Sequence, residues 1–111
     1  HGGRVLDQCP ATAELLEDIA HAVDGSMKIF VDGGIRSGTD VFKAIALGAD
    51  AVIIARPFVT AVYGGEREGV KSYIDKIGGE LEDTMKMCGV SSLKEITRDC
   101  VWTPHDHTIS F

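Results

Sequence analysis

The sequence lacks several features that mark broad functional classes. It contains no basic run, since 11 Lys and Arg stand against 17 Asp and Glu, for a net charge of -6 at pH 7. Nucleic acids and anionic membrane surfaces attract basic patches, so neither is an expected partner. The longest apolar run, AVIIA at residues 51–55, is far shorter than the roughly 20 residues of a membrane-spanning helix.

Cysteine is also scarce, and its spacing does not suggest pairs. The three residues, Cys9, Cys88 and Cys100, lie far apart and form no CxxC pair. An odd number at such spacing argues against a disulfide framework or a zinc site and favours free thiols in a reducing compartment. We therefore expect a cytoplasmic protein.

Two short apolar segments predict buried parallel strands. They are residues 27–32 (MKIFVD) and 49–55 (ADAVIIA), and a helical segment at 38–48 separates them. Strands that are apolar on both faces are typical of parallel sheets covered by helices, so the predicted class is α/β. Two strands cannot close such a sheet, which predicts that the chain is part of a larger barrel or open sheet.

Helical spacing of apolar residues covers most of the remaining chain. It predicts a helix over 10–23, a second one capped by Thr39, and a long one over 70–88. Gly78 and Gly79 lie inside the last helix, where each costs about 1 kcal/mol relative to alanine, so we expect a kink or break there. Residues 100–111 show no period and predict an irregular tail.

Two strand ends are each followed by a turn that carries an arginine. These turns are VDGGIRSG at 31–38 and ARPF at 55–58. Glycine lets backbone N–H groups approach an anion, helix N-termini attract anions, and Arg36 and Arg56 can add bidentate donors. Two such turns on neighbouring strands match the phosphate site after the last two strands of a (β/α)8 barrel. The alternative is two ordinary tight turns with surface arginines.

The first residues and the end of the first strand offer further chemistry. His1 can take up a proton near neutral pH, and Arg4 can clamp a carboxylate, which suits oxidation at a carbon next to a carboxylate. A purely structural loop is the alternative for HGGR. Asp32 can accept hydrogen bonds from ligand hydroxyl groups or cap the following turn.

The order of the segments supports a family resemblance. The segments are, in order, HGGR, VLDQCPAT, VDGGIRSGTDVFKAIALGADAVIIARPF, YGGEREGVKSYI and LEDTMKMCGVSSLKEI. Together they closely resemble the C-terminal part of the FMN-dependent 2-hydroxy acid oxidase and dehydrogenase family. That family includes glycolate oxidase, lactate oxidase and flavocytochrome b2. The resemblance implies that residues 1–99 are the C-terminal part of an FMN-binding (β/α)8 barrel with its last two strands, followed by the tail 100–111.

The resemblance also implies roles for individual residues. His1 matches the family's active-site base or hydride-transfer histidine, and Arg4 matches the arginine that holds the substrate carboxylate. The segments along the FMN ribityl chain and phosphate match Asp32, Gly33, Gly34, Ile35, Arg36, Ala55 and Arg56. The family usually has glycine at the position of Ala55. No metal site is expected, because His105 and His107 fit a solvated tail.

The implied activity is FMN-dependent oxidation of a small 2-hydroxy acid to a 2-oxo acid by the complete enzyme, with the electron acceptor unassigned. We expect the isolated 111-residue chain to be inactive. One alternative is a non-catalytic fragment that self-associates through its strand edges, and another is a different phosphate-binding barrel such as an IMP dehydrogenase-like enzyme. A homo-oligomer is the expected assembly.

Overall fold

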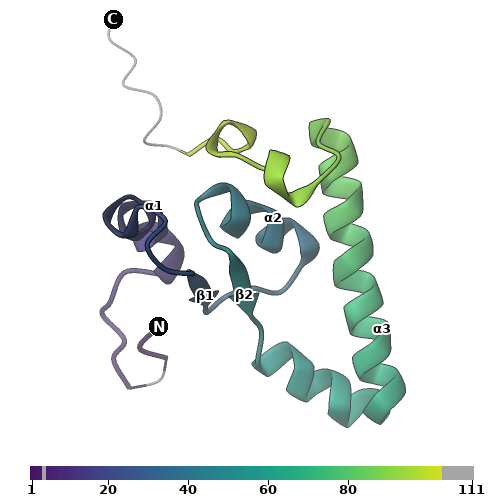
Figure 1. Cartoon of the computed structure of the whole chain (residues 1–111). Coiled ribbons are helices and arrows are strands. Elements are labelled where there is room, and N and C mark those ends of the chain that lie inside the picture. Colours follow the sequence, from purple (N-terminus) through teal and green to yellow (C-terminus); the bar gives the residue numbers. More distant parts are fainter. Residues whose placement is uncertain (4, 104–111) are drawn as a thin grey trace, which may run out of the picture.

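The computed structural model describes residues 1–3 and 5–103, and the elements alternate between helix and strand (Figure 1). In chain order they are α1 (Thr12–Val23), β1 (Phe30–Asp32), α2 (Gly38–Ala46), β2 (Ala51–Ile53), α3 (Arg56–Cys88) and two 3-10 turns, Leu93–Glu95 and Arg98–Cys100. None of the helices in this described part is long and apolar enough to cross a membrane. Arg4, His105 and His107 lie outside the described residues.

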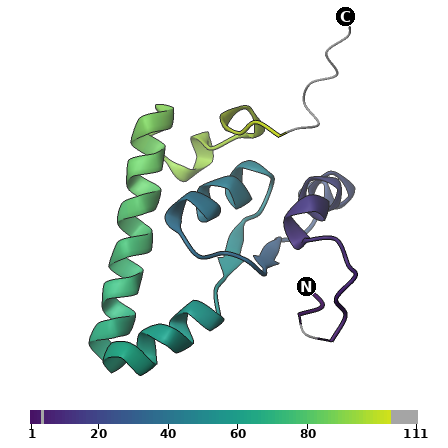
Figure 2. The same cartoon turned by 180° about the vertical axis from the view of Figure 1, so that it is seen from behind.

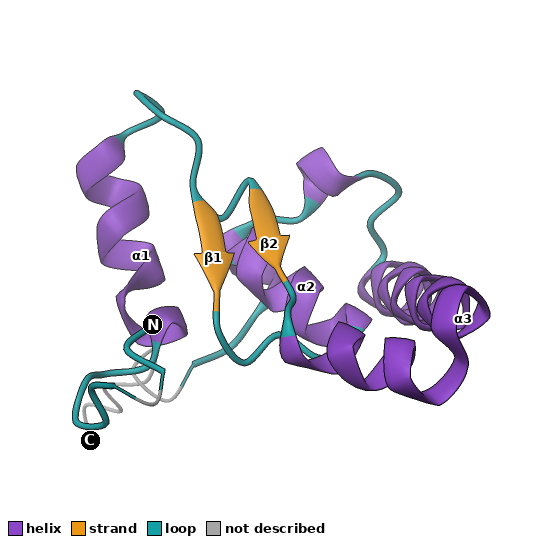
Figure 3. Cartoon of the chain, turned by 90° about the horizontal axis from the view of Figure 1, so that it is seen from below, coloured by secondary structure: helices purple, strands orange, loops and turns teal. Residues whose placement is uncertain are grey.

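The two strands form a parallel pair, as predicted, with Val31 opposite Val52 (Figure 3). The side chain of Val31 is buried against the helices, and its exposed fraction is 5%. On the other face, Phe30 and Ile53 are 63% and 45% exposed. Side chains alternate between the two faces of a strand, so one face of this sheet is covered and the other is open. Within the described residues, the helices thus cover one face of the two-stranded sheet, as expected where two strands alone do not close it.

The core consists of two apolar clusters on either side of α2. The first joins α1, β1 and α2 and contains Leu16, Val31, Ala44 and Ala49. The second is centred on Phe42, which is 2% exposed and packs with Ala46 and Ile96. Leu81 and Met85 of α3 pack against this second cluster, so α2 lies between the sheet and α3 (Figure 2).

The break in α3 lies earlier than predicted. Gly65 and Glu66 have non-helical backbone angles, and Glu66 has φ of +48°, so the helix bends there into two arms. Gly78 and Gly79 instead lie inside the continuous second arm, where an added Cβ would meet no atom within 4 Å. The predicted kink at these glycines is wrong, because packing of the second arm against α2 outweighs their poor helix propensity.

Two further predictions about helices need correction. Ser37, not Thr39, caps α2, since its hydroxyl accepts a hydrogen bond from the Asp40 N–H. Thr39 instead places its hydroxyl 3.2 Å from that of Thr84 on α3. Helical spacing predicts one apolar face on α1, of which only Leu16 is buried; the face consists of Leu15, Leu16, Ile19, Ala20 and Val23.

Candidate functional site

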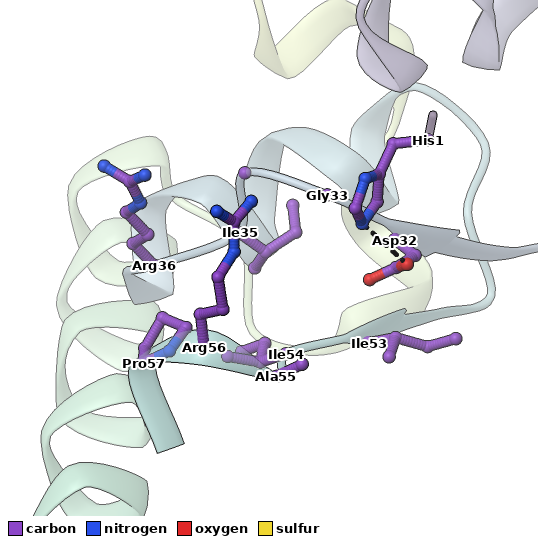
Figure 4. A pocket seen from close by; sticks show the side chains of 11 residues that line it. His1, Asp32, Gly33, Ile35, Arg36, Ile53, Ile54, Ala55, Arg56 and Pro57 are labelled. Carbon is purple, nitrogen blue, oxygen red and sulfur yellow. Dashed lines mark ion pairs between the residues drawn. The ribbon is translucent and has the colours of Figure 1, made fainter. Parts of the chain in front are cut away.

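A pocket lies where β1 and β2 end, and it brings together residues from both of the predicted turns (Figure 4). Its lining consists of His1, Asp32, Gly33, Gly34, Ile35, Arg36, Ile53, Ile54, Ala55, Arg56 and Pro57. Every residue predicted for the site from the sequence is in this set except Arg4, which is outside the described residues. Parallel pairing explains this grouping, because it places both strand ends at one edge of the sheet.

The turn from β1 to α2 begins with two glycines in the left-handed region. Gly33 has φ of +101° and Gly34 has φ of +77°, conformations that other residues adopt only with strain. At Gly33 a side chain would also collide with His1, since a Cβ there would lie 2.8 Å from the imidazole Cδ2. The glycine pair therefore allows both the sharp turn and the close approach of His1.

Carboxylates already occupy the backbone donors at the start of α2. Asp40 Oδ2 accepts hydrogen bonds from the N–H groups of Arg36 and Ser37, at 3.0 and 3.2 Å. Glu80 Oε2 on α3 accepts one from the Gly38 N–H at 2.8 Å. These three amides are not free for an anion, whereas the Arg36 side chain can still offer its donors.

Glu80 is an ionic link between the helices. Its carboxylate accepts hydrogen bonds from Lys76 and from the Gly38 N–H, and these two contacts lower the pKa of Glu80, with Lys76 the larger cause. The hydrogen bond from Lys76 to Glu80 raises the pKa of Lys76. Hydrogen bonds to the charged form favour that form, so the pair stays ionised and holds the start of α2 against α3.

The turn from β2 to α3 is different, because its helix N-terminus has no side-chain cap. Ala55 occupies the N-cap position, Pro57 lies within the first helical positions, and the first turn contains no acidic residue. The partial positive charge of this helix end is therefore not offset by a local carboxylate. Ala55 has φ of -113°, so its methyl group sits in this turn without backbone strain.

Arg36 and Arg56 add two positive charges to the pocket. Both are exposed, and Figure 4 shows both side chains extending toward the same side of the pocket. Among the described residues, neither guanidinium group has a carboxylate within ion-pair distance. Two unpaired guanidinium groups beside an uncapped helix end suit a phosphate group. A phosphate carries up to two negative charges and accepts bidentate hydrogen bonds. The donor set thus fits the phosphate of FMN.

His1 and Asp32 occupy the opposite end of the pocket (Figure 4). His1 Nε2 lies 3.1 Å from Asp32 Oδ2, and both side chains are partly exposed. The Thr12 hydroxyl donates to the Asp32 backbone carbonyl at 2.7 Å, which ties the start of α1 to the end of β1. The pocket therefore has a histidine–carboxylate end and an end with two arginines.

Four residues at this site were not predicted from the sequence: Ile53, Ile54 and Pro57 line the pocket, and Tyr73 contacts the Arg36 turn. Tyr73 of α3 donates a hydrogen bond from its hydroxyl to the Arg36 carbonyl oxygen, at 2.8 Å. The only available signal was its position seven residues before Glu80, which places both on one face of a helix. Tyr63, earlier in the same helix, is 89% exposed.

Comparison with known proteins agrees with this chemistry. Residues 1–103 match the family model described as FMN-dependent dehydrogenase. The chain is 46% identical to a peroxisomal (S)-2-hydroxyacid oxidase of Arabidopsis thaliana and 45% identical to glycolate oxidase 5 of Oryza sativa subsp. japonica. Each match covers 96% of this chain and 29% of the relative, so the chain spans less than a third of their length.

Solved structures give the same result. A crystal structure of mandelate oxidase with benzoyl-formic acid matches 88% of this chain and 29% of its own, with a TM-score of 0.84 and 42% identity. A flavocytochrome b2 with benzoylformate matches 89% of this chain and 26% of its own, with a TM-score of 0.83 and 39% identity. Another mandelate oxidase structure contains an FMN adduct. By its sequence and by its fold, this chain is a member of the FMN-dependent dehydrogenase family.

Proposed function

We propose that this chain supplies the FMN phosphate site and part of the substrate site of an enzyme that oxidises a small 2-hydroxy acid to a 2-oxo acid. The observation that carries the proposal is the pocket with Arg36 and Arg56 at one end and His1 at the other. In the described part of the chain, no carboxylate forms an ion pair with either arginine. Family membership makes FMN the expected cofactor, and this assignment replaces the IMP dehydrogenase-like alternative.

In this proposal Arg36 and Arg56 would bind the phosphate of FMN, and the segment from Asp32 to Ile35 would hold its ribityl chain. Bound FMN supplies the acceptor for the two electrons that leave the substrate carbon. His1 takes up the proton lost from the hydroxyl group or the α-carbon, and Asp32 stabilises the resulting imidazolium from 3.1 Å. Arg4, as the resemblance implies, holds the substrate carboxylate.

We further propose that residues 1–99 form the C-terminal part of a (β/α)8 barrel, with 100–111 as a tail. Two observations support this: Phe30 and Ile53 leave one face of the sheet open, and the relatives are more than three times as long. Such barrels take about 250 residues. The 111-residue chain alone would then be a non-catalytic piece that self-associates through its open strands, and the complete enzyme a homo-oligomer.

The compartment and the remaining partners are proposals as well. We propose a cytoplasmic location, from the cysteine pattern, whereas two of the relatives are named as peroxisomal oxidases. With a net charge of -6, we expect neither nucleic acid nor membrane partners. The acceptor that reoxidises the flavin is unassigned.

The test uses the complete protein that carries this chain, purified and saturated with FMN. We expect tighter binding of FMN than of riboflavin, and anaerobic bleaching of the flavin absorbance on addition of glycolate or mandelate. His1→Gln should leave FMN binding intact and slow the bleaching by about 100-fold or more, because a general base contributes at least that much.

The matched control is His21→Gln on α1, which lies outside the pocket and should change neither quantity. Equal affinity for FMN and riboflavin would contradict the phosphate site. Bleaching by His1→Gln at the wild-type rate would contradict the role of His1.

A further inference from the structure

Tyr73 contacts both turns that carry the pocket arginines. Its hydroxyl donates to the Arg36 carbonyl oxygen at 2.8 Å, and its ring packs edge-on against Phe58, with centroids 4.9 Å apart and planes at 72°. Phe58 lies two residues after Arg56 and in the first turn of α3. One half-buried side chain thus bridges the turn of Arg36 and the turn of Arg56.

The bridge depends on the bend in α3. Tyr73 is fifteen residues after Phe58, and in a straight helix this separation would span about 22 Å. The non-helical residues Gly65 and Glu66 fold the second arm back on the first, which brings the two rings into contact. Gly69 allows this close return, since a Cβ there would lie 2.1 Å from the Ala61 carbonyl oxygen.

The second arm of α3 holds the first turn at two points. Tyr73 binds the carbonyl group of Arg36, and Glu80 binds the N–H of Gly38 at 2.8 Å. The seven residues between Tyr73 and Glu80 amount to two helical turns, so both side chains project from the same face. Tyr73 differs from Glu80 in that it also reaches the second turn, through Phe58.

We propose that Tyr73 is a positioning residue for the cofactor phosphate: it holds the Arg36 turn at the distance from the Arg56 turn at which both guanidinium groups reach one phosphate. This inference rests on the proposed function. Tyr73 does not line the pocket, so it acts through the two turns and not by contact with the ligand. An anion that two donor groups hold binds more weakly when these groups move independently. Binding must then restrict their motion, and this costs free energy.

The experiment compares FMN and riboflavin, which lacks the phosphate, in the complete FMN-binding protein. Tyr73→Phe removes the hydroxyl donor and keeps the ring. We expect it to raise the Kd for FMN about five- to tenfold, the effect of one hydrogen bond, and to leave the Kd for riboflavin unchanged. Phe58→Leu, which keeps the hydroxyl bond and removes the ring contact, should act in the same direction. Tyr63→Phe is the matched control, because Tyr63 is on the same helix and 89% exposed.

Hydrogen exchange without flavin gives a second measurement that does not depend on binding. Amides of residues 36–38 should exchange faster in Tyr73→Phe than in the wild type, while those of α1 should not change. The inference is overturned if this exchange is unaltered, if FMN affinity stays at the wild-type value, or if FMN and riboflavin weaken equally. Equal binding of both flavins by the wild-type protein would instead refute the phosphate site itself.

Discussion

The two turns of the pocket look alike in sequence but differ in how their polar groups are satisfied. The β1–α2 turn is closed: Asp40 and Glu80 bind the amides at the start of α2, and Tyr73 binds the Arg36 carbonyl. The β2–α3 turn is open, since Ala55 provides no side-chain cap and the first turn of α3 has no acidic residue. A glycine–arginine turn before a helix therefore does not always offer its helix-end amides to an anion, because carboxylates of the same chain can accept their hydrogen bonds.

The largest expected effect comes from a substitution that disrupts the contact between the β1–α2 turn and α3. A Cβ on Gly38 would lie 2.2 Å from the Leu81 backbone nitrogen and 2.4 Å from the Ile77 carbonyl oxygen. Backbone atoms cannot yield as a side chain can, so Gly38→Ala should lower the free energy of unfolding by about 3 kcal/mol. Chemical denaturation followed by circular dichroism measures this change.

Gly78→Ala is the matched control for Gly38→Ala. Gly78 lies in the same arm of α3, with no atom near its potential Cβ, so alanine should stabilise the protein by roughly 0.5–1 kcal/mol through helix propensity. Equal behaviour of the two variants would mean that α2 and α3 do not approach as closely as the structure shows.

The next effect concerns the two arginines and tests whether the two turns differ in how strongly they bind the phosphate. Arg56 lies at the uncapped helix end, whereas Arg36 is next to a turn that already contains Asp40. Arg56→Ala should therefore weaken FMN binding by about 2–3 kcal/mol, roughly 30- to 150-fold, and Arg36→Ala by about 1.5 kcal/mol, roughly tenfold. Titration of the complete protein with FMN gives both values. Arg67→Ala, an exposed control near the bend of α3, should bind FMN normally, and the reverse order for the two pocket arginines would contradict the comparison.

A smaller effect tests the carboxylate that closes the first turn. The folded pKa of Glu80 is below its ordinary value of 4.5, so its ionised form contributes stability that is complete above that pH. Glu80→Gln should lower the Tm at pH 7 by less than Gly38→Ala does. The difference in Tm between Glu80→Gln and the wild type should begin to decrease below pH 4.5. It should vanish as the pH falls through the folded pKa of Glu80.

Glu82→Gln provides the comparison for Glu80→Gln, because the pKa of Glu82 is also lowered, by Lys86 four residues later in the same helix. This exposed pair links no other element, so its loss should change the Tm less. If the two variants are indistinguishable at pH 7, the bond from Glu80 to the Gly38 N–H does not secure the turn.

The smallest effect concerns the open turn. Because Ala55 has an unstrained φ of -113°, Ala55→Gly should relieve nothing and should cost about 0.5–1 kcal/mol through added freedom of the unfolded chain. FMN affinity should stay within twofold of the wild type. A clear gain in affinity would show that the methyl group obstructs the phosphate.

Local sequence patterns predicted a substantial part of this protein. Apolar runs located both strands, spacing of apolar residues located α1 and α2, and the loop and turn motifs named eight of the eleven residues that line the pocket. Ile53, Ile54 and Pro57 were not assigned to the site. The bend of α3 was misplaced because helix propensity alone singles out Gly78 and Gly79. Their cost is offset by packing against α2, which no local pattern contains.

Short stretches of residue types in order were enough to predict which segments turn, which carry arginine, and to which family the chain belongs. The packing of α3 sets which turn is held by side chains from a distant helix. Glu80 and Tyr73 lie more than thirty residues from the turn they bind, and the bend at Gly65 and Glu66 sets where they reach it. Contacts between distant segments arise from packing, so the division of the pocket into a closed and an open turn is a property of the fold.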